Sequence, residues 1–253
     1  MDDAPLVVGI DVAASRPSVA VAVRAERRAL EVVAWREADE HEVGDRGRLL
    51  EWLEGLQPSA VAITAAQRPR RAIGAPPPRR ADAELLRRRI AVAPAPTRTQ
   101  AEAGGCRYAH TRAGWAYFKE LRHRGYETLA PGGLSGALGQ APAVLEVYPH
   151  AGFVTLLEGT PPPKNTRDGS HLRVLALRRL GLHWDEYYDV ASLDVLMAAF
   201  IAWRVVQGLA TSVGDERDGG VWLPVTPHDL RDTYVPLTIA GARQAVARLG
   251  SRS

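Results

Sequence analysis

The first part of the chain alternates short apolar stretches with polar turns. Apolar stretches at residues 6–11, 18–23 and 30–35 follow one another closely, a pattern typical of strands joined by hairpins. Leucines at helical spacing then predict a helix over residues 48–56, and a buried strand follows at residues 60–64. Three strands, a helix and a strand in this order predict an α/β fold with strands of mixed direction.

The pattern is interrupted between residues 66 and 142. Residues 68–96 are rich in Pro and Arg and include three consecutive prolines, which fit neither a helix interior nor a sheet ladder, so we expect a surface excursion there. Helices are predicted at residues 82–90 and 111–124. We interpret residues 66–142 as an insertion within a single domain that spans residues 1–253.

Regular elements return in the second half of the chain. A fifth strand is predicted at residues 143–147 and an amphipathic helix at residues 170–180. The helix predicted at residues 190–209 is apolar on nearly every side, which indicates a central, buried helix. Residues 226–253 are interpreted as a C-terminal tail.

The composition is that of an ordinary globular protein. The chain has 253 residues, 46% hydrophobic and 24% charged, and its one cysteine, Cys106, excludes disulfides within the chain and indicates a reducing compartment. The start is acidic, unlike an export signal, and the longest apolar stretch, residues 195–203, is far shorter than the ~20 residues that span a bilayer. We therefore expect a cytoplasmic protein with no membrane segment.

Basic residues are unevenly distributed. The chain has 30 Arg and 2 Lys, and residues 68–124 contain 14 basic residues against four acidic ones. Such a segment on a mildly acidic body suggests a side that faces a polyanion. The alternative is a genome that encodes Arg where others encode Lys, with these side chains solvated.

Three acidic residues lie in apolar surroundings. Asp11 ends the first strand, Glu146 lies in the fifth strand, and Asp194 lies inside the most hydrophobic helix. A buried carboxylate is normally paired, hydrogen-bonded or bound to a metal. Each has a simple alternative: Asp11 could cap a turn, Asp194 could pair with Arg204, and Glu146 could face solvent.

The order of these elements and acids is the layout of the ribonuclease H-like fold. We expect a mixed five-stranded sheet flanked by helices, with an Arg- and Pro-rich insertion. In that fold, acids from the first strand, a neighbouring strand and a late helix converge on divalent metal ions that act on a phosphodiester. Asp11, Glu146 and Asp194 would then be both the catalytic residues and the ligands of Mg²⁺ or Mn²⁺.

The sequence also resembles a known family, domain-of-unknown-function family number 429, which is predicted to contain ribonuclease H-like nucleases. The matching segments are Gly9-Ile10-Asp11, Glu146-Val147-Tyr148-Pro149-His150, Lys164-Asn165-Thr166-Arg167-Asp168-Gly169, Ser192-Leu193-Asp194-Val195-Leu196-Met197-Ala198-Ala199 and Gly220-Val221-Trp222-Leu223-Pro224. In order, they cover about residues 6–225. The resemblance implies a metal-dependent nuclease.

One position departs from the family pattern. Members usually carry an Asp followed by Ala-Pro after the fourth strand, and here Thr64 stands where that acid would fall. A threonine cannot replace an anionic ligand, so we expect weaker metal binding or the loss of one metal site.

Several basic residues are candidates for substrate binding. Lys164 and Arg167 precede a predicted helix, where cations beside a helix N-terminus suit phosphate; the alternative is a solvated linker. His150 could contact phosphate or activate water, or could be structural. Arg79 and Arg80, in the basic segment, are expected to hold a phosphate backbone.

We therefore expect a divalent-metal-dependent nuclease that acts on nucleic acid. The alternative, motivated by Thr64, is a catalytically impaired module of the same fold that binds nucleic acid or protein. A kinase of the actin-like superfamily is a third reading, disfavoured because no glycine-rich turn follows Asp11. The sequence carries no signal for an oligomeric state.

Overall fold

A mixed β-sheet forms the centre of the computed structural model, which describes residues 4–26, 29–39, 42, 44–71, 78–132, 141–184 and 189–249. The strand order is β7-β3-β2-β1-β4-β6-β9-β8, and the short β5 pairs with β6. The strands are β1 Leu6–Asp11, β2 Ser18–Glu26, β3 Ala29–Ala38, β4 Ala60–Ile63, β5 Glu127–Thr128, β6 Ala143–Val147, β7 Leu182–His183, β8 Thr211–Asp215 and β9 Gly219–Leu223.

The strand directions are those of the ribonuclease H-like fold. β1, β2 and β3 form an antiparallel meander, and β4 and β6 continue the sheet from β1 in parallel. The predicted fold class is therefore confirmed. The sheet is larger than the predicted five strands because the β8–β9 hairpin extends one edge and β7 extends the other.

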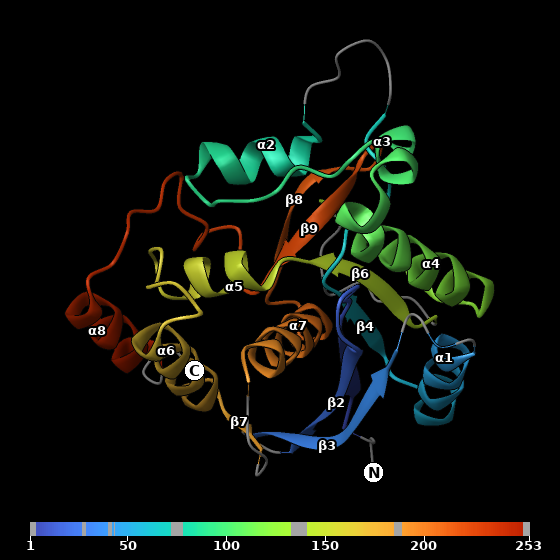
Figure 1. The fold of residues 1–253 in the computed structure, drawn as a ribbon. Helices are drawn as coiled ribbons and strands as arrows, with labels where there is room; N and C mark the ends of the chain where they lie inside the picture. The colour runs from blue at the N-terminus through green and yellow to red at the C-terminus, as the bar shows by residue number, and fades with distance from the viewer. Residues whose placement is uncertain are drawn as a thin grey trace.

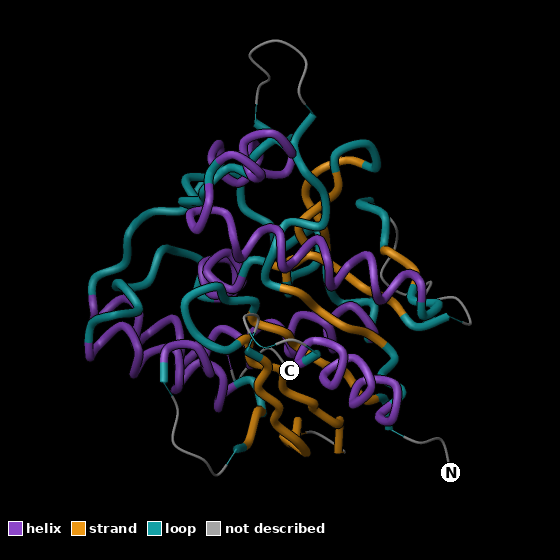
Figure 2. Tube along the Cα trace, turned by 45° about the vertical axis from the view of Figure 1, so that its right-hand side comes forward, coloured by secondary structure: helices purple, strands orange, loops and turns teal. Residues whose placement is uncertain are grey.

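Helices cover both faces of the sheet (Figures 1 and 2). They are α1 Asp45–Leu56, α2 Arg80–Arg87, α3 Arg98–Ala103, α4 Ala109–His123, α5 Pro149–Leu156, α6 Arg167–Arg179, α7 Val190–Val206 and α8 Ile239–Leu249, with a 3₁₀ turn at Gly105–Tyr108. The helix that is apolar on nearly every side, α7, is enclosed between the sheet and the α5, α6 and α8 layer, as its pattern predicts.

The alternation of side chains along the strands divides the apolar residues between two cores, one on each face of the sheet. Val7 of β1 and Ala62 of β4 join the core that contains α7, whereas Val8 and Ile63 join the core under α1 and α4. Successive side chains of a strand point to opposite faces, so a residue's position along the strand decides which core it joins. This alternation also decides where the acidic side chains lie.

Two helices in the segments interpreted as an insertion and a tail contribute to the core. Helix α4, inside the predicted insertion, packs Tyr117, Phe118 and Leu121 against the sheet and so belongs to the core. The predicted C-terminal tail contains α8, whose Ala242 and Val246 pack in the core with α7. Both helices therefore bury an apolar face, α4 against the sheet and α8 on the side of α7.

Candidate functional site

Asp11 lies at the end of the central strand β1 and is 8% exposed. Thr64, which follows the parallel strand β4, donates a hydrogen bond from Oγ1 to Asp11 Oδ1 at 2.7 Å. The same Oγ1 accepts the backbone N–H of Val12 at 3.0 Å. The residue at the position of the missing family acid therefore contacts Asp11 directly, and supplies a hydroxyl there instead of a charge.

Asp194 of α7 is held close to Asp11 by the packing of α7 on β1. A Cβ on Gly9 would lie 2.4 Å from the carbonyl oxygen of Val195 and 2.6 Å from the amide nitrogen of Ala199, so only glycine permits this approach. Burial raises the pKa of Asp194, and the charge of Asp11 raises it further, against the opposing effect of Lys164. We call Asp11 and Asp194 the carboxylate pair.

Each member of the carboxylate pair contacts a partly exposed cation. Arg16 forms an ion pair with Asp11, and Lys164 forms one with Asp194. The side chains of Arg16 and Lys164 are 39% and 49% exposed, respectively. The side chains of Asp11 and Asp194 are only 11% and 13% exposed, so each nearly buried carboxylate is paired with a cation that reaches it from the surface.

The loop that carries Lys164 is tightly built. Arg173, 2% exposed, donates from Nη1 to the carbonyl oxygens of Pro162 at 2.9 Å and Gly169 at 2.7 Å. A Cβ on Gly169 would lie 1.9 Å from the carbonyl oxygen of Pro163, so the loop rests directly on the first turn of α6. The side chain of Thr166 caps that helix. Lys164 is therefore presented by a braced segment.

His150 and Arg167 both lie near Lys164, and they differ in charge. Burial, with smaller contributions from Arg173 and Lys164, lowers the pKa of His150 to about 4, so its ring is neutral at neutral pH. Arg167 is exposed at the first residue of α6. A phosphate near this helix would meet charge from Lys164 and Arg167, and only hydrogen bonding from His150.

Glu146 points away from the carboxylate pair. Glu146 is in register with Ile63, which is in register with Ile10, so these three side chains share the face opposite α7. The predicted three-acid cluster is thus not brought together: Asp11 and Asp194 lie on one side of the sheet and Glu146 on the other. Glu146 is in register with Ile10 and not with Asp11, and this shift of one residue places its side chain on the opposite face.

Glu146 is instead part of a buried ion trio with Arg79 and Asp82. Arg79 donates to both oxygens of Glu146, at 2.9 and 2.7 Å, and to both oxygens of Asp82, at 3.2 and 2.9 Å. All three residues are at most 4% exposed. The backbone N–H of Gln67 also donates to Glu146, and that of Ala95 to Asp82.

The ion trio corrects the expected role of Arg79. Its guanidinium donates four hydrogen bonds to the carboxylates of Glu146 and Asp82, so Arg79 is an internal counterion and not a contact for a phosphate backbone. The neighbouring Arg80 is exposed and pairs with Glu84 at 2.9 Å. The arginine followed three residues later by an aspartate was the available sequence signal for the pair between Arg79 and Asp82.

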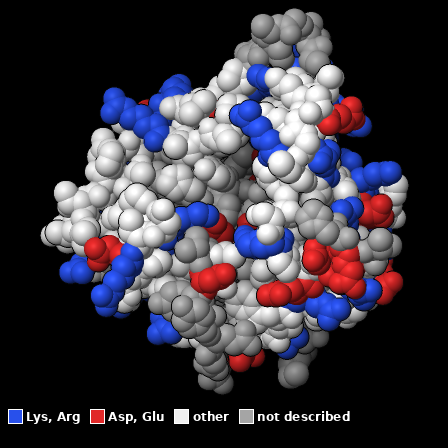
Figure 3. Space-filling model, viewed as in Figure 1, with Lys and Arg blue, Asp and Glu red and all other residues white. Residues whose placement is uncertain are grey.

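Much of the charge of the basic segment is matched by nearby acids. Arg71 pairs with Asp218, Arg88 with Asp232, and Arg124 with Glu54. Figure 3 shows basic and acidic side chains interspersed over the visible face of the molecule. A candidate phosphate site is therefore defined by Lys164 and Arg167, near Asp194, more sharply than by the Arg-rich segment as a whole.

The donor set limits which metal ion this site can take. Within the ranges described, no group of three or more His, Cys, Asp or Glu side chains is arranged to hold a metal ion. Mg²⁺ needs only one or two protein carboxylates, completing its shell with water and substrate phosphate, so the carboxylate pair fits one such ion. Thr64 supplies no charge for a second ion, and Glu146 and Asp82 are engaged by Arg79.

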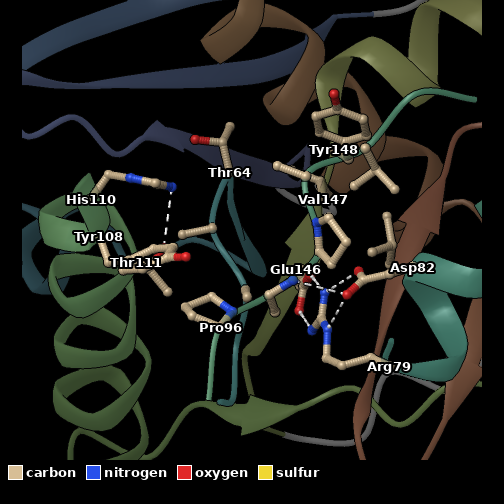
Figure 4. Close-up of a pocket in the computed structure, with 17 residues that line it drawn as sticks. Thr64, Arg79, Asp82, Pro96, Tyr108, His110, Thr111, Glu146, Val147 and Tyr148 are labelled. Atoms are coloured by element: carbon tan, nitrogen blue, oxygen red, sulfur yellow. Dashed lines mark hydrogen bonds and ion pairs between the residues drawn. The ribbon is translucent and has the colours of Figure 1, made fainter. Parts of the chain in front are cut away.

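A pocket of about 180 Å³ (Figure 4) is lined by Thr64, the residue that bonds to Asp11. Thr64 lines one side of it, and His110 and Thr111, at the start of α4, line another. Arg79 reaches Glu146 and Asp82 at its floor. Burial lowers the pKa of His110, with the charge of Asp11 opposing, so this ring is also neutral at neutral pH.

Sequence reasoning missed Gly9, Arg16, Asp82 and Arg173, which position or neutralise the acids. Arg16 and Asp82 had local signals, because Arg16 lies five residues after Asp11 and Asp82 lies three residues after Arg79. Among the described residues, no helix is long and apolar enough to cross a membrane.

Comparisons with known proteins identify the family to which this chain belongs. Comparison with curated proteins gives no match. Among solved structures, T. thermophilus RuvC in complex with Holliday junction substrate is similar, with a TM-score of 0.43 and 13% sequence identity, covering 83% of this chain and 99% of that one. The family model described as "Protein of unknown function (DUF429)" matches residues 5–218, and the chain therefore belongs to that family.

Proposed function

We propose that this protein is a divalent-metal-dependent phosphodiesterase that acts on nucleic acid, with Asp11 and Asp194 as its metal ligands. One observation carries the proposal: close packing of α7 on Gly9 brings Asp194 to the side of the sheet where Asp11 lies, and a braced lysine contacts Asp194. Such a pair, with Asp11 at the end of β1 and Asp194 in α7, suits Mg²⁺ or Mn²⁺ together with a phosphate.

The chain's own residues would divide the work. A divalent ion bound here would polarise a phosphodiester and activate water. Lys164 and Arg167 would bind phosphate oxygens, and Thr64 would keep Asp11 oriented through its hydrogen bond. Neutral His150 would orient a phosphate or a water by hydrogen bonding. Arg80 would contact the phosphate backbone of the nucleic acid at a greater distance from the carboxylate pair. The single cysteine, Cys106, supports a cytoplasmic location as part of this proposal.

The test is cleavage of labelled single- and double-stranded RNA and DNA in the presence of Mg²⁺ or Mn²⁺. Asp11→Asn and Asp194→Asn should each lower the rate at least 100-fold, and should also abolish Mn²⁺ binding measured by electron paramagnetic resonance. Asp232→Asn, which changes an aspartate that is 91% exposed, is the matched control and should behave as the parent does. Parent-like cleavage by Asp11→Asn would contradict the proposal.

A second candidate is favoured by Thr64: a module that binds nucleic acid without cutting it. With a hydroxyl in place of the third carboxylate, binding would depend on phosphate contacts and weaken steeply as salt rises. The variant Thr64→Asp distinguishes the two candidate functions. If the parent binds without cleavage and Thr64→Asp gains both tighter Mn²⁺ binding and cleavage, the parent is the impaired module. If the parent already cleaves, the module is excluded.

A further inference from the structure

The pocket beside Asp11 has the size of a single heterocycle. Its volume is about 180 Å³, and an engineered protein cavity of about 150 Å³ takes up benzene, whereas drug-sized ligands occupy roughly 300 Å³ or more. Thr64 lines the pocket and also bonds to Asp11, so the pocket begins one side chain away from the carboxylate pair.

The charge of the pocket disfavours a phosphate and favours N–H donors. The ion trio at its floor contains one guanidinium and two carboxylates, so its net charge is negative. Among the described residues, Oε1 of Glu146 accepts one hydrogen bond, from Arg79, and a carboxylate oxygen can accept a second. An amino group that enters the pocket would find this acceptor, whereas an anion would be repelled.

The walls of the pocket offer flat and apolar surfaces. Tyr148, at the end of β6, and Tyr108, before α4, line it together with Pro94 and Pro96 (Figure 4). The hydroxyl of Tyr148 donates to the carbonyl oxygen of Ala91 at 2.9 Å, which fixes the ring. Fixed aromatic rings are the surfaces on which nucleobases stack in single-stranded complexes.

We propose that this pocket binds one nucleobase that carries an exocyclic amino group, while the adjoining phosphate lies at the carboxylate pair. The inference rests on the proposed function and deepens it by naming the part of the substrate that this surface takes. Cytosine, adenine and guanine present an amino group to the floor. Uracil and thymine flank their one exposed N–H with two carbonyl acceptors, which the carboxylates would repel.

The test measures binding of cytidine, adenosine and uridine by NMR, without divalent ions and without cleavage. Cytidine and adenosine should bind saturably, and uridine about tenfold more weakly, since one good base contact discriminates by that factor. Ala66→Phe should abolish binding, because Ala66 is half-buried and lines the pocket. Ala103→Phe, at an exposed residue of α3, is the control and should bind as the parent does.

A second arm compares a single-stranded cytosine-rich oligonucleotide with one that lacks bases at its central positions. Weaker binding of the abasic strand supports the inference. Equal binding of both strands, or no nucleoside binding to the parent, overturns the inference and leaves the phosphate site standing. Nucleoside binding without any oligonucleotide binding supports the pocket and contradicts the proposed function.

Discussion

At the scale of single residues, Arg79 has unusual surroundings. Its guanidinium donates four hydrogen bonds to two carboxylates, with 3% of the residue exposed. Enclosing three charges costs desolvation energy, which good geometry offsets, but removing one partner leaves the others under-compensated. The trio also ties α2 and Ala95 to β6, so it holds one wall of the pocket against the sheet.

Glu146→Gln should destabilise the protein strongly without changing metal affinity. Breaking a buried ion pair costs about 3–5 kcal/mol, and we expect a loss of that order in urea unfolding. Mn²⁺ affinity of the folded variant should stay at the parent value, because Glu146 faces away from the carboxylate pair.

Glu84→Gln is the matched control, since it removes the exposed pair with Arg80 and should cost at most about 1 kcal/mol. A stable Glu146→Gln protein with weakened Mn²⁺ binding would instead make Glu146 a metal ligand.

The sequence predicts that the buried acids have partners, but it does not predict which partner each one has. An acid in an apolar stretch signals a partner, and Asp11, Glu146 and Asp194 all have one. Which partner each has depends on strand register, which the apolar pattern of β4 and β6 does not specify, because both strands are buried on both faces.

At the scale of elements, the approach of α7 to β1 determines the site. Helix α7 carries Asp194, and its backbone lies against Gly9, two residues before Asp11. The distance between the two carboxylates is therefore set by helix–strand packing and not by a flexible loop.

Gly9→Ala should damage both stability and the site. Its Cβ would meet backbone atoms of α7, which cannot move like a side chain, so we expect a loss of at least about 2–3 kcal/mol. A displaced α7 would also separate Asp194 from Asp11, and Mn²⁺ affinity should fall with stability.

Gly47→Ala serves as the control for Gly9→Ala. Gly47 lies in α1 with nothing within 4 Å of its added Cβ, so the change should stabilise the protein by about 0.5–1 kcal/mol through helix propensity. Unfolding in urea checks both values. Equal effects of the two substitutions would contradict the close packing of α7.

Elements with strong periodicity were predictable, and those defined by distant contacts were not. The strands β1 to β4 and the helices α1 and α7 follow from their apolar patterns. The strands β8 and β9 contain glycines at Gly214, Gly219 and Gly220, which weaken a strand pattern. β9 pairs with β6, which is far away in sequence, and β8 joins the sheet through β9.

At the scale of the whole molecule, two buried groups should make stability depend on pH in opposite directions. The pKa of His150 is lowered from 6.5 to about 4, so the unfolded chain binds more protons between these values and stability rises with pH there. The pKa of Asp194 is raised above 3.8, so the folded chain binds more protons between 3.8 and that raised pKa. The contribution of Asp194 to the free energy of unfolding therefore falls as pH rises through this range.

His150→Gln should flatten the dependence of stability on pH between about pH 4 and 6.5. Each unit of pKa difference corresponds to ~1.4 kcal/mol, so the parent should lose roughly 2–3 kcal/mol across this window as the pH falls, and the variant should lose less. Urea unfolding at several pH values measures this. His123→Gln, at an exposed site, should keep the parent profile; an unchanged profile in His150→Gln would contradict the prediction.

The bracing of the Lys164 loop has a thermodynamic consequence for ligand capture. A lysine on a free loop loses backbone and side-chain entropy when it closes on an anion, and this loss subtracts from affinity. Here Arg173, Gly169 and the cap of α6 have already fixed the backbone during folding. An anion arriving at this end of the sheet therefore needs to immobilise little more than one ammonium group.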